Sequence, residues 1–432
     1  QLHLAQNMNG KTIGISIKDR SAILPVGHTA NAQQTVRFFH KWPEPQNMYY
    51  FEQAVTEFEA ANPGIKIKME AVADEAYKDK IRVLMASDQV PDVFFSWSGE
   101  FGRQFSRNGR SLDITDEVYG TNWNESFPEA FMKPFSYKGR QFGVPMNIDA
   151  KFMVYNKKIF AENGISVPQN YANFLAACAK LKEAGITPIA FGNQYPWAAS
   201  HYVGELIAKF VPKEVKSADF SLLADSDVLY TDPGYEKALE EFQYLNDKGF
   251  FNRGSNALPH SIARGSFSFG RNAMMYMEMV EFIDLKETKL ALDGWGFFKL
   301  PKFNEDEIDF ITGAPEGFMV SAKSMHPDAA IKFLKFLTSP EQGKMYFETT
   351  GMTSAINGAI NEDNADANIL KGVEAINASA DLALWLDTDM DARTTEVFLA
   401  GTQAVLTGSE TPIEIMIKVR ETALAVKESR QE

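Results

Sequence analysis

The sequence predicts an α/β protein of two lobes, each a mostly parallel sheet flanked by helices. The chain is 432 residues long, and a domain usually takes about 100–200 residues, so this length suggests two or three folding units. Short apolar strands alternate with amphipathic helices from residue 35 to the C-terminus, as in parallel sheets with helical crossovers. Since the sequence shows no long linker and no sustained repeat, two α/β lobes account for it.

The first five predicted elements alternate as strand, helix, strand, helix, strand. The strands cover 36–39, 65–69 and 93–95, and the second of them alternates apolar with charged residues, as a strand with one solvent-facing side does. Apolar residues recur at helical spacing across 51–58 and 77–84. This order predicts an α/β domain with a largely parallel sheet in the first part of the chain.

The same alternation continues to the C-terminus. We expect strands at 142–145, 152–156, 188–191, 273–277 and 295–298, and helices at 171–183, 231–248, 327–337, 339–347 and 412–427. The helix after Ser339 opens with a capping box and a proline at its first helical position, which are start signals for a helix. These elements predict a second α/β lobe.

The charge balance excludes some partners. Lys and Arg number 43 against 57 Asp and Glu, a net charge of −14, which repels nucleic acid and anionic membrane surfaces at long range. No window approaches 18 uninterrupted apolar residues, so the sequence predicts no membrane-spanning segment. The single cysteine, Cys178, lies in an apolar-periodic stretch where we expect a core role, and one cysteine cannot form an internal disulfide.

Residues 1–34 begin with Gln and show no amphipathic period. The triplet from Ala30 to Ala32 has the small-x-small form of a signal-peptidase site, although the apolar run before it is short. This segment suggests export. It is left unassigned, because the sequence does not distinguish a native end from a signal-derived or a constructed one.

The sequence lacks the common catalytic and metal-binding motifs. It has no G-x-S-x-G elbow and no G-x-G-x-x-G turn, and its six histidines are scattered without a pair at helical ligand spacing. Asp387, Asp389 and Asp391 resemble the start of a calcium loop, but Ala392 and Phe398 stand where that loop needs Gly and Glu. We therefore expect no catalytic residue, no metal and no cofactor.

Three tryptophans lie in loops at predicted strand ends: Trp42, Trp97 and Trp197. Open α/β sheets bind ligands at the carboxyl ends of their strands. An indole ring there can stack on the C–H face of a sugar while neighbouring polar side chains bond its hydroxyl groups. A loop tryptophan covers the hydrophobic core about as often as it stacks on a ligand, so both interpretations stay open for each of the three rings.

Several motifs occur together in one order: Phe58-Glu59-x-x-Asn62-Pro63-Gly64-Ile65, Pro91-Asp92-Val93-Phe94-Phe95-x-Trp97, Tyr137-x-Gly139-x-Gln141-Phe142-Gly143-Val144-Pro145, Tyr155-Asn156-Lys157-x-x-Phe160, Gly164-Ile165, Gly313-Ala314-Pro315-Glu316-Gly317-Phe318 and Leu337-Thr338-Ser339-Pro340-Glu341. In these motifs the chain resembles the extracellular solute-binding proteins of ABC importers, in the sugar-binding group similar to maltose-binding protein. Each motif is weak by itself, but their joint order and spacing are specific.

The resemblance implies a periplasmic-binding-protein-like fold, in which two hinged lobes close on a ligand. By this likeness lobe 1 comprises 35–115 and 312–338, and lobe 2 comprises 116–311 and 339–432. The chain would cross between the lobes three times, the last time at the start of the Ser339 helix.

The resemblance also assigns ligand-binding residues: Trp42, Glu44, Trp97, Ser98, Glu100, Asn147, Asp149, Trp197, His201, Glu278, Glu316, Trp385, Asp387 and Arg393. Some of these residues have structural alternatives. Glu44 and Glu100 could be solvated loop charges, Asn147 and Asp149 could be turn residues, and Arg393 could lie on a surface helix.

The function that follows from the resemblance is capture of a neutral carbohydrate, an oligosaccharide, in an interlobe cleft and its delivery to the permease subunits of an ABC transporter. Anionic ligands usually call for Arg and Lys clusters, and Arg103, Arg107 and Arg110 lie beyond the binding loops. The alternative ligand is a polyol, a polyamine or another small molecule, because a site of aromatic rings and carboxylates can also bind these ligands. A carbohydrate-active enzyme is the third hypothesis. We expect a binding protein without enzymatic activity.

The expected protein is an exported monomer, periplasmic or extracellular, with or without a membrane anchor. The sequence does not disclose which sugar it takes, the length or linkage of that sugar, or the identity of the permease.

Overall fold

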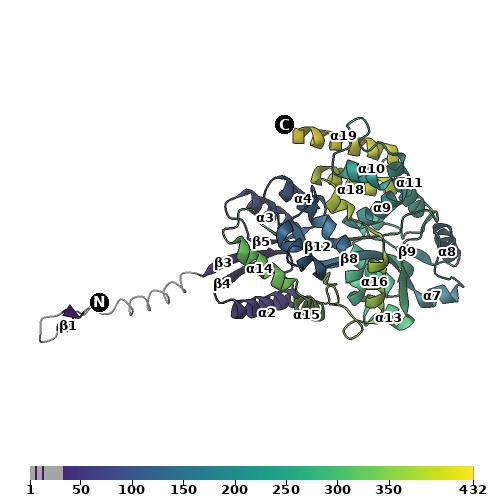
Figure 1. Ribbon diagram of the computed structural model, residues 1–432. Helices are drawn as coiled ribbons and strands as arrows, with labels where there is room; N and C mark the ends of the chain where they lie inside the picture. The colour runs from purple at the N-terminus through teal and green to yellow at the C-terminus, as the bar shows by residue number, and fades with distance from the viewer. Residues whose placement is uncertain (1–4, 7–11, 14–32, 432) are drawn as a thin grey trace. The chain divides into compact units, whose positions relative to one another are not determined.

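The computed structural model describes residues 5–6, 12–13 and 33–431 (Figure 1). The triplet at Ala30 and most of the segment 1–34 lie outside the described residues. The chain divides into two compact units. Unit 1 is Gln1–Phe95, Arg110–Leu112 and Met319–Leu337, and unit 2 is Ser96–Gly109, Asp113–Phe318 and Thr338–Glu432.

Unit 1 contains a parallel sheet in the order β4-β3-β5, in which Phe38 of β3 pairs with Met69 of β4 and Val93 of β5. The predicted strands and helices of this part are confirmed. The elements are β1 (Ala5–Gln6), β2 (Thr12–Ile13), β3 (Gln34–His40), α2 (Pro45–Ala61), β4 (Ile65–Ala71), α3 (Asp74–Ala86), β5 (Val93–Trp97, whose last two residues belong to unit 2) and α14 (Pro327–Leu337).

The core of unit 1 is built from aromatic rings on the buried faces of its elements. The ring of Phe38 makes edge contacts with Phe51 of α2 at 5.5 Å and with Phe333 of α14 at 5.1 Å between centroids. Phe58 packs against Phe333 in the same way at 5.1 Å. These contacts fix α2 and α14 against the sheet, since aromatic pairs in this geometry add to the burial of their area.

The sheet of unit 2 has the order β12-β8-β10-β9 and mixes parallel with antiparallel pairs. β10 runs parallel to β9, and β12 parallel to β13, whereas β8 is antiparallel to β10 and β11. The strands are β6 (Ser136–Tyr137), β7 (Arg140–Gln141), β8 (Gly143–Asn156), β9 (Thr187–Ala190), β10 (Asn272–Glu278), β11 (Trp295–Phe298), β12 (Phe310–Val320, whose last two residues belong to unit 1) and β13 (Asp381–Ala383).

β8 corrects one sequence prediction. The strands expected at 142–145 and 152–156 are one strand of 14 residues. The polar residues between them suggested a turn, but Asn147, Asp149 and Lys151 are buried within the strand.

Helices make up most of the rest of unit 2. They are α4 (Glu100–Arg107), α5 (Thr115–Tyr119), η1 (Trp123–Ser126), α6 (Glu129–Met132), η2 (Lys133–Phe135), α7 (Lys157–Glu162), α8 (Tyr171–Glu183), α9 (Trp197–Phe210), α10 (Lys213–Phe220), α11 (Pro233–Asp247), η3 (Ser255–Ala257), α12 (His260–Ser268), η4 (Met279–Leu285), α13 (Lys289–Asp293), α15 (Pro340–Thr350), α16 (Ala367–Ala378), α17 (Leu386–Asp389), α18 (Ala392–Thr407) and α19 (Pro412–Gln431). The helices expected in this unit are confirmed, with shifts of a few residues at their ends.

The helices α9 and α18 were not predicted from the sequence, and both pack against other helices of unit 2. α9 and α18 contact each other and α11, and the three lie side by side in Figure 1. Most residues of α9 are buried, from Ala198 to Ile207. A helix that is apolar on nearly all sides has a weak periodic signal, which explains why the pattern of the sequence did not reveal it.

No helix within the described ranges is both long and apolar enough to cross a bilayer. The α/β class is confirmed, with helices flanking sheets in which parallel pairs are frequent.

Gly317 allows β12 to pass close to β8. A Cβ atom at this position would lie 1.9 Å from the carbonyl oxygen of Val144. Alanine at Gly317 is expected to lower the free energy of unfolding by about 2 kcal/mol or more, because both backbones are held in the sheet and cannot move apart cheaply.

The matched control is Gly265→Ala in α12, where an added Cβ meets no described atom within 4 Å. This change is expected to raise stability by about 0.5–1 kcal/mol, since alanine is the better helix former. Urea denaturation compares the two variants with the wild type. Equal midpoints for Gly317→Ala and wild type would contradict the close approach.

Candidate functional site

An aromatic group in unit 2 is centred on His201. The imidazole of His201 stacks on Trp385, with ring centroids 4.1 Å apart and planes 19° apart. Trp197 lies one helical turn earlier on α9, and its ring centroid is 5.4 Å from that of His201. The sequence produces this arrangement locally, because α9 begins at Trp197 and residues four apart share a helix face.

Two carboxylates face the ring nitrogens of His201. Nδ1 is 3.4 Å from Oε1 of Glu278, and Nε2 is 3.4 Å from Oδ1 of Asp387. Glu278 ends β10 and Asp387 lies on α17, so two elements distant in sequence bring acid to the same imidazole. The imidazole of His201 is therefore held by the stack on one face and by negative charge at its edges.

A buried cation lies beside this aromatic group. Lys151 of β8 is 1% exposed, and its Nζ is 5.3 Å from the ring centroid of Trp197 and 5.4 Å from that of Tyr276. Aromatic faces attract a cation most strongly when water is excluded. Lys151 thus partly balances the carboxylates of the group and orients the indole of Trp197.

His260 joins the group from the start of α12. Its ring centroid lies 4.8 Å from that of Trp197, and its Nε2 is 2.7 Å from Oε1 of Glu281. Arg264 donates to the same oxygen at 2.7 Å. Burial acts to raise the pKa of Glu281, but the hydrogen bond from His260 and the charges of His260 and Lys151 outweigh it and lower the pKa to about 2.

Asp149 is a buried acid of a different kind. Its Oδ1 accepts hydrogen bonds from the backbone N–H groups of Ala150 at 2.9 Å and Val280 at 3.2 Å. Burial, and then the negative charges of Glu278 and Glu316, raise its pKa well above the ordinary value of 3.8. Asp149 therefore keeps its proton to a higher pH than an ordinary aspartate, and in the protonated form it can donate a hydrogen bond.

Asn147, Asp149 and Lys151 lie on the same face of β8, because alternate residues of a strand share a face. The side-chain amide of Asn147 donates to Oε2 of Glu316 at 3.4 Å. Its Oδ1 is buried and accepts no hydrogen bond from the described residues. Such an atom is free to accept a hydrogen bond from a bound hydroxyl group.

The structure brings eight of the fourteen predicted residues together. Trp197, His201, Glu278, Trp385 and Asp387 are joined by the contacts above. Asp149 is coupled by charge to Glu278 and Glu316, and Asn147 donates a hydrogen bond to Glu316. We call these eight residues, with Lys151, Tyr276, His260 and Glu281, the His201 group.

The residues after β5 lie in unit 2 as well. Trp97 packs its ring edge-on against Phe101, with centroids 4.9 Å apart. The hydroxyl oxygen of Ser98 is buried and has no hydrogen-bond partner among the described residues. Glu100 instead pairs with Arg107 and, at 2.9 Å, with Arg430, so it belongs to a separate charged cluster.

Trp42 and Glu44 belong to unit 1. The buried Trp42 stacks on Phe51 at 5.8 Å and meets Phe95 edge-on at 4.8 Å, which are packing contacts. Glu44 is exposed before α2 and accepts a hydrogen bond from the side chain of Asn47 at 3.2 Å. The binding roles of these two residues, and that of the exposed Arg393 on α18, stay predictions.

The three aspartates that resembled a calcium loop face three different partners. Asp387 faces His201, Asp389 accepts from Arg103 at 3.0 Å, and Asp391 caps α18 by accepting from the N–H of Thr394 at 2.9 Å. No three His, Cys, Asp or Glu side chains gather as metal ligands in the part of the chain that the structure describes.

Sequence reasoning missed Lys151, His260, Glu281 and Tyr276. The signal available for Lys151 was the polar alternation on β8, at positions 147, 149 and 151. Tyr276 and Glu281 lie five residues apart and His260 precedes them on α12, and no local pattern marked any of the three.

One protein family, described as bacterial extracellular solute-binding protein, matches residues 42–344. A multiple sugar-binding protein of Streptococcus mutans is 23% identical to the chain, with 77% of each chain covered. A diacetylchitobiose binding protein of Streptomyces coelicolor is 26% identical over 77% of this chain and 74% of that protein. A solved chitin oligosaccharide binding protein has a TM-score of 0.79 and 21% identity over 91% of this chain and 99% of that chain, a likeness of fold.

The raised pKa of Asp149 predicts a pH-dependent effect of Asp149→Asn. Above about pH 4 the unfolded chain loses the proton of this carboxyl group, while the folded chain holds it to a higher pH, so folding of the wild type becomes less favourable as pH rises through this range. Asparagine avoids this cost and can still accept the two backbone hydrogen bonds. We expect Asp149→Asn to raise the melting temperature at pH 7, and the gain to fade toward pH 4.

The control is Asp227→Asn at an exposed position of unit 2, which is expected to give no pH-dependent gain. Calorimetry at pH 4, 5.5 and 7 measures the difference. A loss of stability for Asp149→Asn that grows with pH would show that Asp149 is ionised in the folded protein.

Proposed function

Because the chain belongs to the family of bacterial extracellular solute-binding proteins, we propose that it captures a neutral carbohydrate, an oligosaccharide, and delivers it unchanged to the permease subunits of an ABC transporter. The relatives named for multiple sugars and for diacetylchitobiose support a carbohydrate ligand. Capture of this kind requires export, so we also propose a periplasmic or extracellular location and a monomeric protein.

The observation that carries the proposal is the aromatic surface of Trp197, His201 and Trp385 with polar groups at its edge. An aromatic ring offers a flat apolar face to the C–H face of a pyranose. The hydroxyl groups around that sugar ring then need donors and acceptors in the same plane. A hydrogen bond to a charged group contributes about 1.5–3 kcal/mol net, and a neutral one about 0.5–1.5 kcal/mol.

The His201 group offers both kinds of partner. Asp149 can donate when protonated, which its raised pKa favours, while Glu278, Glu316 and Oδ1 of Asn147 can accept. An anionic ligand would meet the negative charge of Glu278, Glu316 and Asp387, and it would gain only the charge of Lys151. The arrangement therefore favours a ligand that is uncharged and rich in hydroxyl groups.

A polyamine is the second candidate, because carboxylates outnumber the one ammonium group of the His201 group. An ammonium ligand could pair with Glu278 or Asp387 and lie over the ring of Trp385. The buried Lys151 weighs against this candidate, since it would repel a second cation in a site with little water to screen the charges.

The predicted lobes remain part of the proposal. We propose that lobe 1 (35–115 and 312–338) and lobe 2 (116–311 and 339–432) close on the sugar, which shifts the population toward the closed form because only that form makes all its contacts. The radius of gyration from small-angle X-ray scattering is then expected to fall when the sugar saturates the protein. An unchanged value at full occupancy would contradict closure.

A thermal-shift screen against mono- and oligosaccharides, with polyamines as comparison ligands, identifies the ligand. At a concentration of about 100 times the Kd, a ligand adds about 2.7 kcal/mol to the free energy of unfolding, and the melting temperature rises accordingly. Trp197→Ala is expected to weaken binding of that sugar by about tenfold or more, because one of the two indole rings of the aromatic surface is removed. Titration calorimetry measures the change.

Tyr244→Ala removes an exposed ring of α11 outside the His201 group and is the matched control, expected to leave affinity unchanged. Wild-type affinity in Trp197→Ala would place the sugar elsewhere. A rise in melting temperature with polyamines and with no sugar would favour the second candidate. Recovery of shortened sugars after incubation would favour an enzyme instead of a binder.

A further inference from the structure

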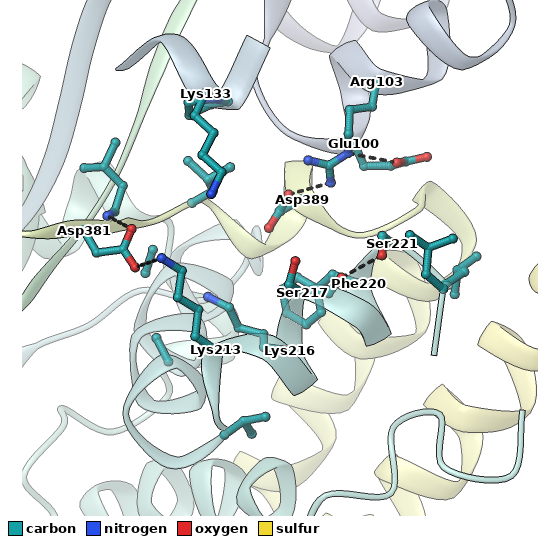
Figure 2. A pocket seen from close by; sticks show the side chains of 18 of the residues that line it. Glu100, Arg103, Lys133, Lys213, Lys216, Ser217, Phe220, Ser221, Asp381 and Asp389 are labelled. Carbon is teal, nitrogen blue, oxygen red and sulfur yellow. Dashed lines mark hydrogen bonds and ion pairs between the residues drawn. The ribbon is translucent and has the colours of Figure 1, made fainter. Parts of the chain in front are cut away.

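A second candidate site in unit 2 is a cavity of about 1020 Å³ (Figure 2). Its walls come from α4, the segment 130–138, the end of α9, α10, the start of β12, β13 and the end of α19. None of its lining residues belongs to the His201 group. The His201 group therefore does not explain the cavity, although Glu100, one of the fourteen residues predicted to bind ligand, lines it.

The lining of this cavity is strongly basic. Among the described residues that line it, nine are Lys or Arg and four are Asp or Glu. The excess is unexpected in a chain with a net charge of −14. Cations that gather against the overall charge of a protein create a local positive potential, which attracts anions.

The four carboxylates of the cavity are already engaged. Glu100 is shared by three guanidinium groups, those of Arg103, Arg107 and Arg430. The other three carboxylates each have one basic partner: Asp389 pairs with Arg103, Asp381 with Lys213 and Glu307 with Lys209.

Lys133 and Lys216 have no carboxylate within ion-pair range in the described part of the chain. In Figure 2 their ammonium ends, with that of Lys213, point into the same space from opposite sides. Burial lowers the pKa of Lys216 and outweighs the charges of Asp389 and Asp381. An anion between the two lysines would offset this cost, because it would pair with both ammonium groups.

The rest of the wall is apolar. Phe210, Phe220 and Phe310 line the cavity, and Leu223 and Ile308 at its surface are 80% and 63% exposed. Large apolar side chains this exposed lose contact with water when an apolar group covers them, and that burial is favourable. An inorganic anion would leave these side chains in water, and a neutral sugar would leave the two lysines unpaired.

We propose that this cavity binds an amphipathic organic anion, a molecule with an apolar body and a carboxylate, sulfonate or phosphate group. The apolar body lies against the phenylalanine rings and Leu223, and the anionic group lies between Lys133 and Lys216. Charge-assisted hydrogen bonds to the two ammonium groups supply the preference for a negative charge.

Two fluorescent probes test the proposal. Anilinonaphthalene sulfonate carries the required apolar rings and anionic group, and N-phenyl-naphthylamine has the same rings without the sulfonate. The wild type is expected to bind the sulfonate at one site about tenfold or more tighter than the neutral amine, and more weakly as ionic strength rises. In the double variant Lys133→Glu with Lys216→Glu, we expect the affinity for the sulfonate to fall at least about tenfold.

Lys68→Glu on the exposed side of β4 makes a similar charge change outside the cavity and is expected to leave binding unchanged. The melting temperature of each variant verifies that it folds, and the single variants serve if the double variant does not. Equal affinity for both probes, or wild-type affinity for the sulfonate in every folded lysine variant, would overturn the proposal. Trp197→Ala should retain sulfonate binding, so this experiment succeeds or fails independently of the proposed sugar site.

Discussion

The candidate site depends on the burial of three polar side chains on one strand. β8 pairs with β10 and β11, and Asn147, Asp149 and Lys151 lie buried on one of its faces. A buried charge is costly unless it is paired, and a buried acid can avoid the cost by keeping its proton. The raised pKa of Asp149 favours the second course, while Lys151 lies over the rings of Trp197 and Tyr276. The polar side chains on this face of β8 need partners inside the protein, and the same side chains form the polar part of the candidate site.

The sequence predicted the elements whose periodic signal is local. The strands of unit 1 and the helices α8 and α11 have clear apolar spacing and clear end signals, and the structure has them within a few residues. α9 was missed because burial on most sides removes the polar face that makes a helix recognisable in a sequence. β8 was divided in two because buried polar residues resemble a turn until their partners in the fold are known.

The same distinction applies to the site. Resemblance indicated Trp197, His201 and Trp385, and the structure packs these rings together. Glu281 could not be found in this way, because its lowered pKa arises from His260 and Lys151, which lie on two other elements. Glu100 was expected beside the sugar, yet its charge is taken up by Arg103, Arg107 and Arg430. A carboxylate that is paired with three guanidinium groups has few acceptor sites left for the hydroxyl group of a sugar.

α17 separates two chemical environments within four residues. Asp387 turns to His201, and Asp389, two positions later, pairs with Arg103 in the basic cavity. Arg103 and Arg107 follow the loop of Glu100 in sequence, but only the fold places them with lysines from α10 and η2. Negative charge therefore gathers around the aromatic surface and positive charge around the cavity. On the two proposals above, this segregation excludes anions from the sugar site and admits them to the cavity, both within unit 2.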